Sequence, residues 1–214
     1  MISGLLLSAA THLPVAWMGR PFAALRVTNP VSPFLAQIVY TLPMPDQIFL
    51  DELSRRDRAG FVAAVGHIFE RSPWVAEAAW AARPFADLTA LHAAMCAAVG
   101  AAGAERQLAL ICAHPDLAGR LARAGQLGAE STQEQLAAGL DALGPAEAAQ
   151  FDAYNGAYRE RFGFPFVICA REHKKASILA AFPRRLANTR EQEIAVALAE
   201  IAKIAWLRLQ DCVV

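Results

Sequence analysis

The feature that most constrains this chain is a succession of helix signals from Asp46 to the C-terminus, with almost no alternating or β-branched runs. Apolar residues recur there every three or four positions, which is the spacing of one buried face of an α-helix. The 47 alanines among the 214 residues favour helix at the positions between them. The pattern predicts an all-α fold, in a single compact domain of roughly seven or eight helices.

Capping residues, prolines and glycines mark where the helices begin and end. Four pairs resemble N-terminal caps: Ser54 with Asp57, Ser72 with Pro73, Ser131 with Glu134, and Thr189 with Gln192. We expect helices over about residues 55–70, 73–82, 87–100, 104–113, from 131 onward, 145–161, 177–186 and 189–209. No repeat of about 20–50 residues is visible, which disfavours a solenoid.

Residues 1–43 differ in composition from the rest of the chain. They carry two arginines, no acidic residue and five of the twelve prolines. A secretory signal has a basic region before its apolar stretch, and a transit peptide is usually richer in arginine, so neither is favoured. We expect residues 1–45 to be an extension outside the fold, with Met44 as the natural start, and residues 46–214 to form the helical domain.

The charge balance and the cysteines argue against several classes of protein. The 20 basic residues equal the 20 acidic residues, so no net field attracts nucleic acid or an anionic membrane. No run approaches the ~20 apolar residues of a membrane span. The four cysteines form no C-x-x-C pair, so we expect neither a zinc knuckle nor a redox dithiol. A cytoplasmic location, where thiols stay reduced, is the expectation.

Two segments place polar side chains at expected helix ends. His114 follows one helix and precedes Pro115, which disfavours helical geometry at the histidine. An imidazole there either belongs to an ordinary turn or acts as an acid and base in a cleft. Residues 130–135, with Ser131 and Glu134, are either a capped helix start or a site where spare backbone donors meet an anionic ligand.

Two further features lie nearer the C-terminus. The run FGFPFVICAR at 162–171 interrupts the helices with a glycine and a proline, and it is either a core plug or the floor of a pocket. Arg208 lies near the end of the last helix, where its guanidinium either complements the helix dipole or clamps a carboxylate.

The order of these segments resembles a known family. In sequence they are HPDLAGR at 114–120, ESTQEQLAAGL at 130–140, Asn155 with Tyr158, RFGFPFVICAR at 161–171, RRLANT at 184–189 and IAWLRL at 204–209. Together they resemble the 2-oxo-4-hydroxy-4-carboxy-5-ureidoimidazoline (OHCU) decarboxylases. IFERSPWV at 68–75 and RPF at 83–85 resemble that family's N-terminal signature. The resemblance covers about residues 46–214.

The resemblance implies an all-α enzyme for the last step of the conversion of urate to (S)-allantoin. It implies no cofactor, a small-molecule substrate and a homodimer, for which Trp74 and Trp80 are either a subunit contact or ordinary core residues. His114 is implied as the catalytic acid and base, with Glu134 polarising it and Arg208 holding the carboxylate or oxyanion of the substrate. Arg171, Arg184 and Arg185 are alternatives to Arg208.

The implied substrate-binding residues come from three segments. They are Pro115; Ser131, Thr132, Gln133 and Gln135, beside Glu134; and Phe166, Val167, Ile168, Cys169 and Ala170. The third group would supply main-chain contacts and a stacking wall. A substrate built of amide and ureido groups needs each buried donor and acceptor matched, and a site of Glu, Gln, Ser and backbone groups suits that demand.

Other functions remain open from the sequence alone. The tripeptide at 114–116 is also that of a J-domain co-chaperone, although the helix before it carries a single basic residue, Arg106. A metal-dependent lyase or hydrolase could use His114, Asp116 and Glu134, although no H-x-x-x-H or H-E-x-x-H pair accompanies them. A helical module without enzymatic activity is the third alternative.

Overall fold

The computed structural model describes residues 47–214 except positions 120, 121 and 123. Within these residues the chain is helical, and its β pairing is a single isolated bridge between Ile48 and Val213. The prediction of an all-α fold is therefore confirmed. The expected extension, residues 1–45, lies outside the described residues, as does Met44, the expected natural start of the chain.

The described residues form nine α-helices and two short 3₁₀ turns. The helices are α2 (Leu50–Arg55), α3 (Arg58–Val65), α4 (Trp74–Ala79), α5 (Leu88–Ala101), α6 (Ala104–Ala113), α8 (Ala129–Ala137), α9 (Pro145–Phe162), α10 (Lys175–Leu186) and α11 (Arg190–Cys212). The 3₁₀ turns are Trp80–Ala82 and Ala170–Glu172. Each expected helix has a counterpart, but the first, expected over about residues 55–70, ends at Val65, and Ile68 and Phe69 lie in the turns that follow it. Among the described residues, sequence analysis missed α2, in which Leu53 is the single buried residue.

The caps agree with the sequence at some helix starts and not at others. The Thr189 side chain accepts a hydrogen bond from the Gln192 amide at the start of α11, as expected. Asp57, rather than Ser54, caps α3 by accepting from the Gly60 amide at 2.7 Å. The other two expected caps are also displaced, because α4 begins one residue after Pro73 and α8 begins after Gly128. The third residue of α8, Ser131, is therefore free of a capping role.

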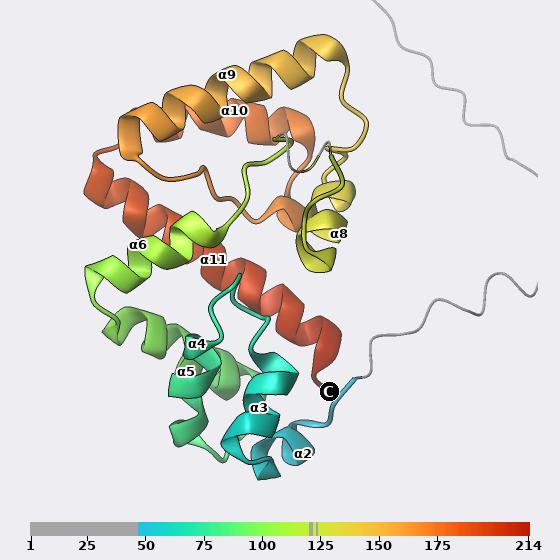
Figure 1. The fold of residues 1–214 in the computed structure, drawn as a ribbon, viewed down its shortest axis with the longest axis vertical. Coiled ribbons are helices and arrows are strands. Elements are labelled where there is room, and N and C mark those ends of the chain that lie inside the picture. Colours follow the sequence, from blue (N-terminus) through green and yellow to red (C-terminus); the bar gives the residue numbers. More distant parts are fainter. Residues whose placement is uncertain (1–46, 120–121, 123) are drawn as a thin grey trace, which may run out of the picture. The chain divides into compact units, whose positions relative to one another are not determined.

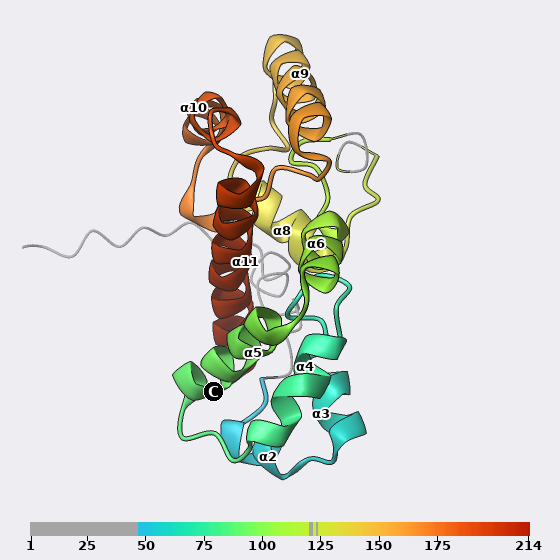
Figure 2. The same cartoon turned by 90° about the vertical axis from the view of Figure 1, so that its left-hand side faces the viewer.

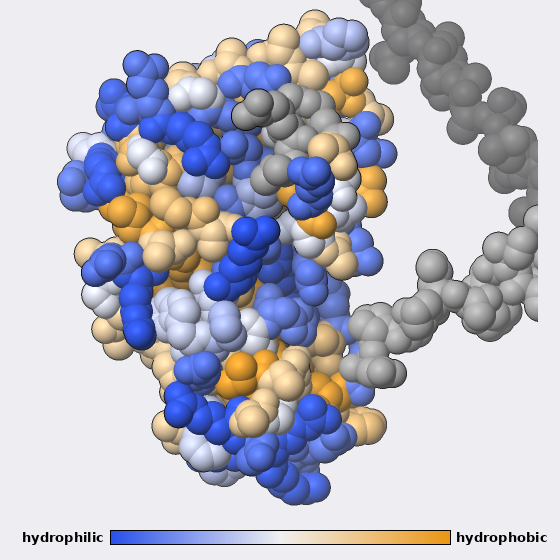
Figure 3. Space-filling model, viewed as in Figure 1, coloured by the Kyte–Doolittle hydropathy of each residue, from blue (hydrophilic) through white to orange (hydrophobic). Residues whose placement is uncertain are grey.

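Helix α11 runs through the middle of the described part of the chain, between the other helices (Figures 1 and 2). It packs against α5 and α6, while α9 and α10 pack on each other at one end of the described unit. Helices α2, α3 and α4 lie at the opposite end (Figure 1). In the same view, the space-filling surface over that end shows a small apolar area surrounded by hydrophilic side chains (Figure 3).

An aromatic cluster anchors the segment that follows α9. The Tyr158 ring on α9 has edge contacts with Phe162, Phe164 and Phe166, and the Phe166 ring stacks on Phe182 of α10 at 3.9 Å between centroids. Gly163 ends α9 with φ of 80°, a left-handed conformation that glycine adopts without steric cost. The phenylalanines of the FGFPF run are thus core residues, and they fix the path of the chain beyond them.

A buried polar network holds the same segment from the other side. Glu193 is fully buried and contacts Arg185, Tyr158 and Asn188. Arg185 also donates to the main-chain carbonyl of Val167. Burial, together with the neighbouring Glu193 carboxylate, raises the pKa of the Tyr158 hydroxyl, which therefore stays protonated and donates to that carboxylate. These contacts give residues 166–170 a single position beside α8 and α11.

Candidate active site

His114 is the residue at which α6 stops. Its backbone is extended (φ −75°, ψ 140°), as the following proline requires, and its side chain is buried with 6% of the residue exposed. Nδ1 lies 3.0 Å from the Leu110 carbonyl oxygen. A carbonyl can only accept, so this contact assigns the proton to Nδ1 and leaves a lone pair on Nε2 in the neutral ring.

Burial decides the charge of this imidazole. Desolvation lowers the pKa of His114 to about 4, while the Leu110 carbonyl and the Glu70 carboxylate favour the charged form and the Arg208 guanidinium opposes it. His114 is therefore neutral near pH 7. A buried neutral imidazole with a lone pair on Nε2 is prepared to take a proton, and Glu70 would stabilise the imidazolium that results.

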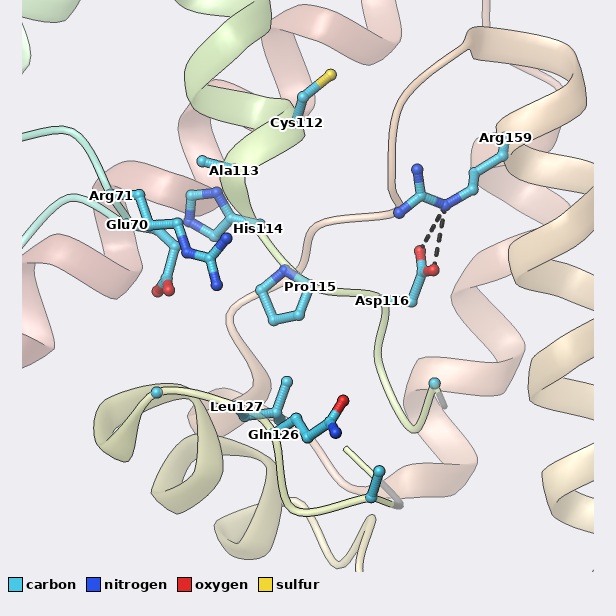
Figure 4. Close-up of a pocket in the computed structure, with 13 residues that line it drawn as sticks. Glu70, Arg71, Cys112, Ala113, His114, Pro115, Asp116, Gln126, Leu127 and Arg159 are labelled. Atoms are coloured by element: carbon cyan, nitrogen blue, oxygen red, sulfur yellow. Dashed lines mark hydrogen bonds and ion pairs between the residues drawn. The ribbon is translucent and has the colours of Figure 1, made fainter. Parts of the chain in front are cut away.

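The turn after His114 is held by contacts to two other helices. The Gln135 side chain on α8 accepts from the Ala118 amide at 2.9 Å, and Asn155 on α9 donates to the Leu117 carbonyl at 2.9 Å. Asp116 forms an ion pair with Arg159 of α9, at 2.9 Å and 3.1 Å from Nε (Figure 4). These long-range contacts give Asn155 of the sequence motif a structural role, and they fix the path of the chain that follows His114.

Arg208 lies in a buried ion cluster. Its residue is 4% exposed, and its guanidinium binds both oxygens of Glu134, at 2.7 Å from Nε and 3.0 Å from Nη2. The same Nη2 lies 3.0 Å from Glu70, and the Ser131 hydroxyl donates to that Glu70 carboxylate at 3.0 Å. Arg208 is thus engaged by two carboxylates in this structure, which is a stronger role than complementing the helix dipole.

Glu70 is a site residue that sequence analysis did not single out, as is its neighbour Arg71. It was part of the IFERSPWV signature, but nothing assigned it a role. In the structure it accepts from Ser131 and Arg208 and acts electrostatically on His114. The available signal was a carboxylate directly after the apolar pair Ile68 and Phe69, both of which are buried.

Two cavities meet at His114 and Pro115. The open one has a volume of about 600 Å³, which suits a small ligand, and it is also lined by Glu70, Arg71 and Asp116 (Figure 4). The inner one measures about 30 Å³, room for about one water molecule. It is lined by Ser131, Glu134, Gln135, Phe166, Val167, Ile168 and Ala170, together with Leu117 and Ile204. Most of the expected binding residues therefore surround the smaller space.

The remaining expected binding residues lie away from both cavities. Thr132 and Gln133 are exposed on α8, and the Thr132 hydroxyl donates to the Gly128 carbonyl at 2.8 Å. Cys169 is fully buried, its amide donates to Glu200 at 2.8 Å, and burial raises the pKa of its thiol to about 11.

None of the three alternative arginines lines the His114 cavities. Arg171 forms an ion pair with Asp211, Arg185 belongs to the buried network with Glu193, and Arg184 is exposed on α10. Among the described residues that line the two cavities, none is one of these arginines.

The structure gives a metal site no support among residues 47–119, 122 and 124–214. No three His, Cys, Asp or Glu side chains come together there in a way that could hold an ion. Of the three metal ligands that the sequence suggested, Asp116 forms an ion pair with Arg159, and Glu134 forms one with Arg208.

Over the same residues no single helix meets the length and hydropathy of a membrane span, although the bent pair α5 and α6 does when the two are counted together.

Comparison with known proteins identifies the family. The family model for OHCU decarboxylase matches residues 54–210. The chain belongs to the OHCU decarboxylase family. The OHCU decarboxylase of Amia calva is 44% identical over 153 residues, which cover 72% of this chain and 87% of that protein. That of Halalkalicoccus jeotgali is 38% identical over 168 residues, or 78% of this chain and 93% of that protein.

Solved structures agree with this family assignment. A crystal structure of (S)-allantoin synthase matches with a TM-score of 0.60 and 34% identity, and the match covers 77% of this chain and about half (54%) of that one. A crystal structure of OHCU decarboxylase in the presence of (S)-allantoin matches with a TM-score of 0.54 at 21% identity, covering 72% of this chain and 96% of that one. The second likeness supports the fold alone.

Proposed function

We propose that this protein decarboxylates OHCU to (S)-allantoin, with His114 as the acid and base. The observation that carries the proposal is a buried, neutral imidazole at the edge of a ligand-sized cavity, with its lone pair on Nε2. Membership of the OHCU decarboxylase family supplies the substrate.

The chemistry needs little more than one proton carrier. The carbon that bears the carboxylate and hydroxyl adjoins a ring C=N bond, so the electron pair released with CO₂ moves into the substrate itself. His114 Nε2 takes the hydroxyl proton as the C–C bond breaks. The imidazolium then returns that proton to one face of the neighbouring ring carbon, which gives a single stereoisomer. The ring nitrogen that received the electron pair takes one further proton from solvent, which completes the neutral product.

The cluster of Glu70, Glu134 and Arg208 has a supporting part in this scheme. Glu70 stabilises the transient charge on His114, and Glu134 lines the inner cavity beside it. Gln135 also lines that cavity and holds the turn after His114 through the Ala118 amide. The amide and ureido groups of the substrate would meet these polar side chains and the main chain of residues 166–170.

The direct experiment supplies OHCU made in place from urate by urate oxidase and hydroxyisourate hydrolase, and follows (S)-allantoin by circular dichroism. We expect chelator-resistant formation of the (S) product, and a loss of about 10²–10⁴-fold in His114→Asn. His173→Asn, a histidine outside both cavities, is the matched control and should keep full activity. Folded wild-type protein that does not exceed the spontaneous reaction would reject the proposal.

The co-chaperone alternative is disfavoured by the same geometry. A J-domain tripeptide must be accessible to its partner, whereas His114 is 6% exposed and Asp116 is engaged by Arg159. Failure to stimulate an Hsp70 ATPase would agree with this interpretation.

Three further statements are part of the proposal. We propose that residues 46–214 form the catalytic domain, which the family match over 54–210 supports. We propose a homodimer in the cytoplasm, and light scattering after gel filtration tests its mass. Trp74 and Trp80 are each half-buried against a neighbouring arginine, Arg106 and Arg83, so their rings are not a bare contact surface.

A further inference from the structure

The cation expected to hold the substrate carboxylate is already engaged. Arg208 donates from Nε and Nη2 to Glu134 and Glu70, and its Nη1 approaches the carbonyls of His67 and Ile68 at 3.5 Å and 3.4 Å. Two carboxylates and one guanidinium leave this cluster with a formal charge of −1. To bind an incoming carboxylate, Arg208 would have to give up buried hydrogen bonds to Glu134 or Glu70.

The open cavity has two other arginines among its described lining residues, Arg71 and Arg159. Arg159 is bound to both oxygens of Asp116. Arg71 has no hydrogen bond or ion pair with any residue in the described part of the chain. Figure 4 shows its guanidinium extending into the cavity beside the His114 ring and Pro115. A cation so placed, without a carboxylate partner, is available to an anionic ligand.

The backbone at Arg71 supports a role for this placement. Its φ is 46°, in the left-handed region that a non-glycine residue rarely adopts and that costs of the order of 1 kcal/mol. This conformation lets Glu70 lie against the buried Ser131 and Arg208 while its neighbour Arg71 reaches the open cavity. Strain of this kind, retained at a site, indicates that the direction of the side chain matters.

We propose that Arg71 is the residue that binds the substrate carboxylate, in the open cavity beside His114. The inference rests on the proposed function for the identity of the ligand, a cyclic ureide that carries one carboxylate. Arg208 then acts as a positioning residue that holds Glu70 and Glu134. Because CO₂ carries the carboxylate away, Arg71 loses its partner on turnover and does not retain the uncharged product.

The test compares Arg71→Gln and Arg71→Lys with wild type. We expect Arg71→Gln to lower kcat/KM for OHCU by about 10- to 100-fold, the worth of a charge-assisted contact, chiefly through KM. Arg71→Lys should retain part of the affinity, because it keeps the charge and loses the forked geometry. Arg184→Gln, an exposed arginine outside the cavity, is the matched control and should behave as wild type.

Inhibition by the product, (S)-allantoin, distinguishes a loss of carboxylate binding from a general change in the shape of the cavity. (S)-Allantoin lacks the carboxylate, so its inhibition constant should change less than about twofold in Arg71→Gln. Equal losses for OHCU and allantoin would overturn the proposal, as would unchanged kinetics with OHCU.

A binding measurement keeps this inference separate from the proposed function. Calorimetric titration with hydantoin-5-acetate, and with uncharged hydantoin as its matched partner, does not require turnover. Tighter binding of the carboxylate that disappears in Arg71→Gln supports the site even if wild-type protein fails to decarboxylate OHCU. Equal binding of the two compounds by wild-type protein would reject the site.

Discussion

The buried cluster around Arg208 allows a prediction about stability that depends on charge rather than volume. Replacing Arg208 with glutamine leaves Glu70 and Glu134 without their cation, although their side chains are only 13% and 12% exposed. Removing one partner of a buried ion pair typically costs about 3–5 kcal/mol, because the other charge remains desolvated. A typical domain has about 5–15 kcal/mol of stability in total, so we expect Arg208→Gln to be strongly destabilised but foldable.

A second substitution tests the cause of that loss. In Arg208→Gln, the additional change Glu134→Gln removes one uncompensated charge at nearly constant volume. We expect the double variant to recover about 1–3 kcal/mol of the lost unfolding free energy, which is the coupling that contacting charged residues show. Arg184→Gln, on the exposed side of α10, should stay within about 0.5 kcal/mol of wild type.

The assay is urea unfolding at pH 7, followed by fluorescence of the four tryptophans and by far-ultraviolet circular dichroism. Coincident transitions by the two probes would justify a two-state treatment. A cost below about 1 kcal/mol for Arg208→Gln, or a double variant less stable than the single one, would refute the charge argument.

Other predictions concern pH, backbone and chain length. The pKa of His114 is about 4 in the folded protein and about 6.5 in the unfolded chain, so the unfolded chain binds the proton first as pH falls. The free energy of unfolding should therefore drop by up to about 3 kcal/mol between pH 7 and pH 4. This part of the pH dependence, measured by urea titration, should vanish in His114→Asn. At the C-terminal end of α9, Gly163→Ala should cost about 1 kcal/mol because of its left-handed φ. Gly156→Ala, inside α9 with open space around it, should stabilise the fold by about 0.5–1 kcal/mol. Urea unfolding measures both. A chain starting at Met44 should keep the wild-type kcat/KM; a loss beyond about tenfold would contradict the proposed domain boundary.

Helix boundaries were predictable wherever the signal was local. Asp87 caps α5 through a hydrogen bond to the amide three residues later, and Thr189 does the same for α11. Such contacts form within one turn, so the residues that make them lie together in the sequence. Helix α2 was not predicted, because it has six residues and one buried side chain, Leu53, which is too little to show a helical spacing of apolar residues.

The S-x-x-E pattern at Ser131 shows where local interpretation fails. Both side chains suit a capping box, yet Gly128 precedes the helix and takes the cap position instead. Ser131 and Glu134 then turn toward Glu70 and Arg208, partners 61 and 74 residues away. No local rule distinguishes the two outcomes, because the free energy that decides between them comes from burial against other helices.

The amino-acid sequence by itself therefore determined the helical class, most helix boundaries and the position of His114 at a helix exit, since these follow from hydrogen bonds and sterics between near neighbours. Only the tertiary structure decided the electrostatics of the site. Burial sets the neutral state of His114, and packing of α11 against distant segments occupies Arg208 with carboxylates while Arg71 faces the open cavity. Desolvation and charge pairing depend on every group that surrounds an atom, and those groups are assembled only when the chain folds.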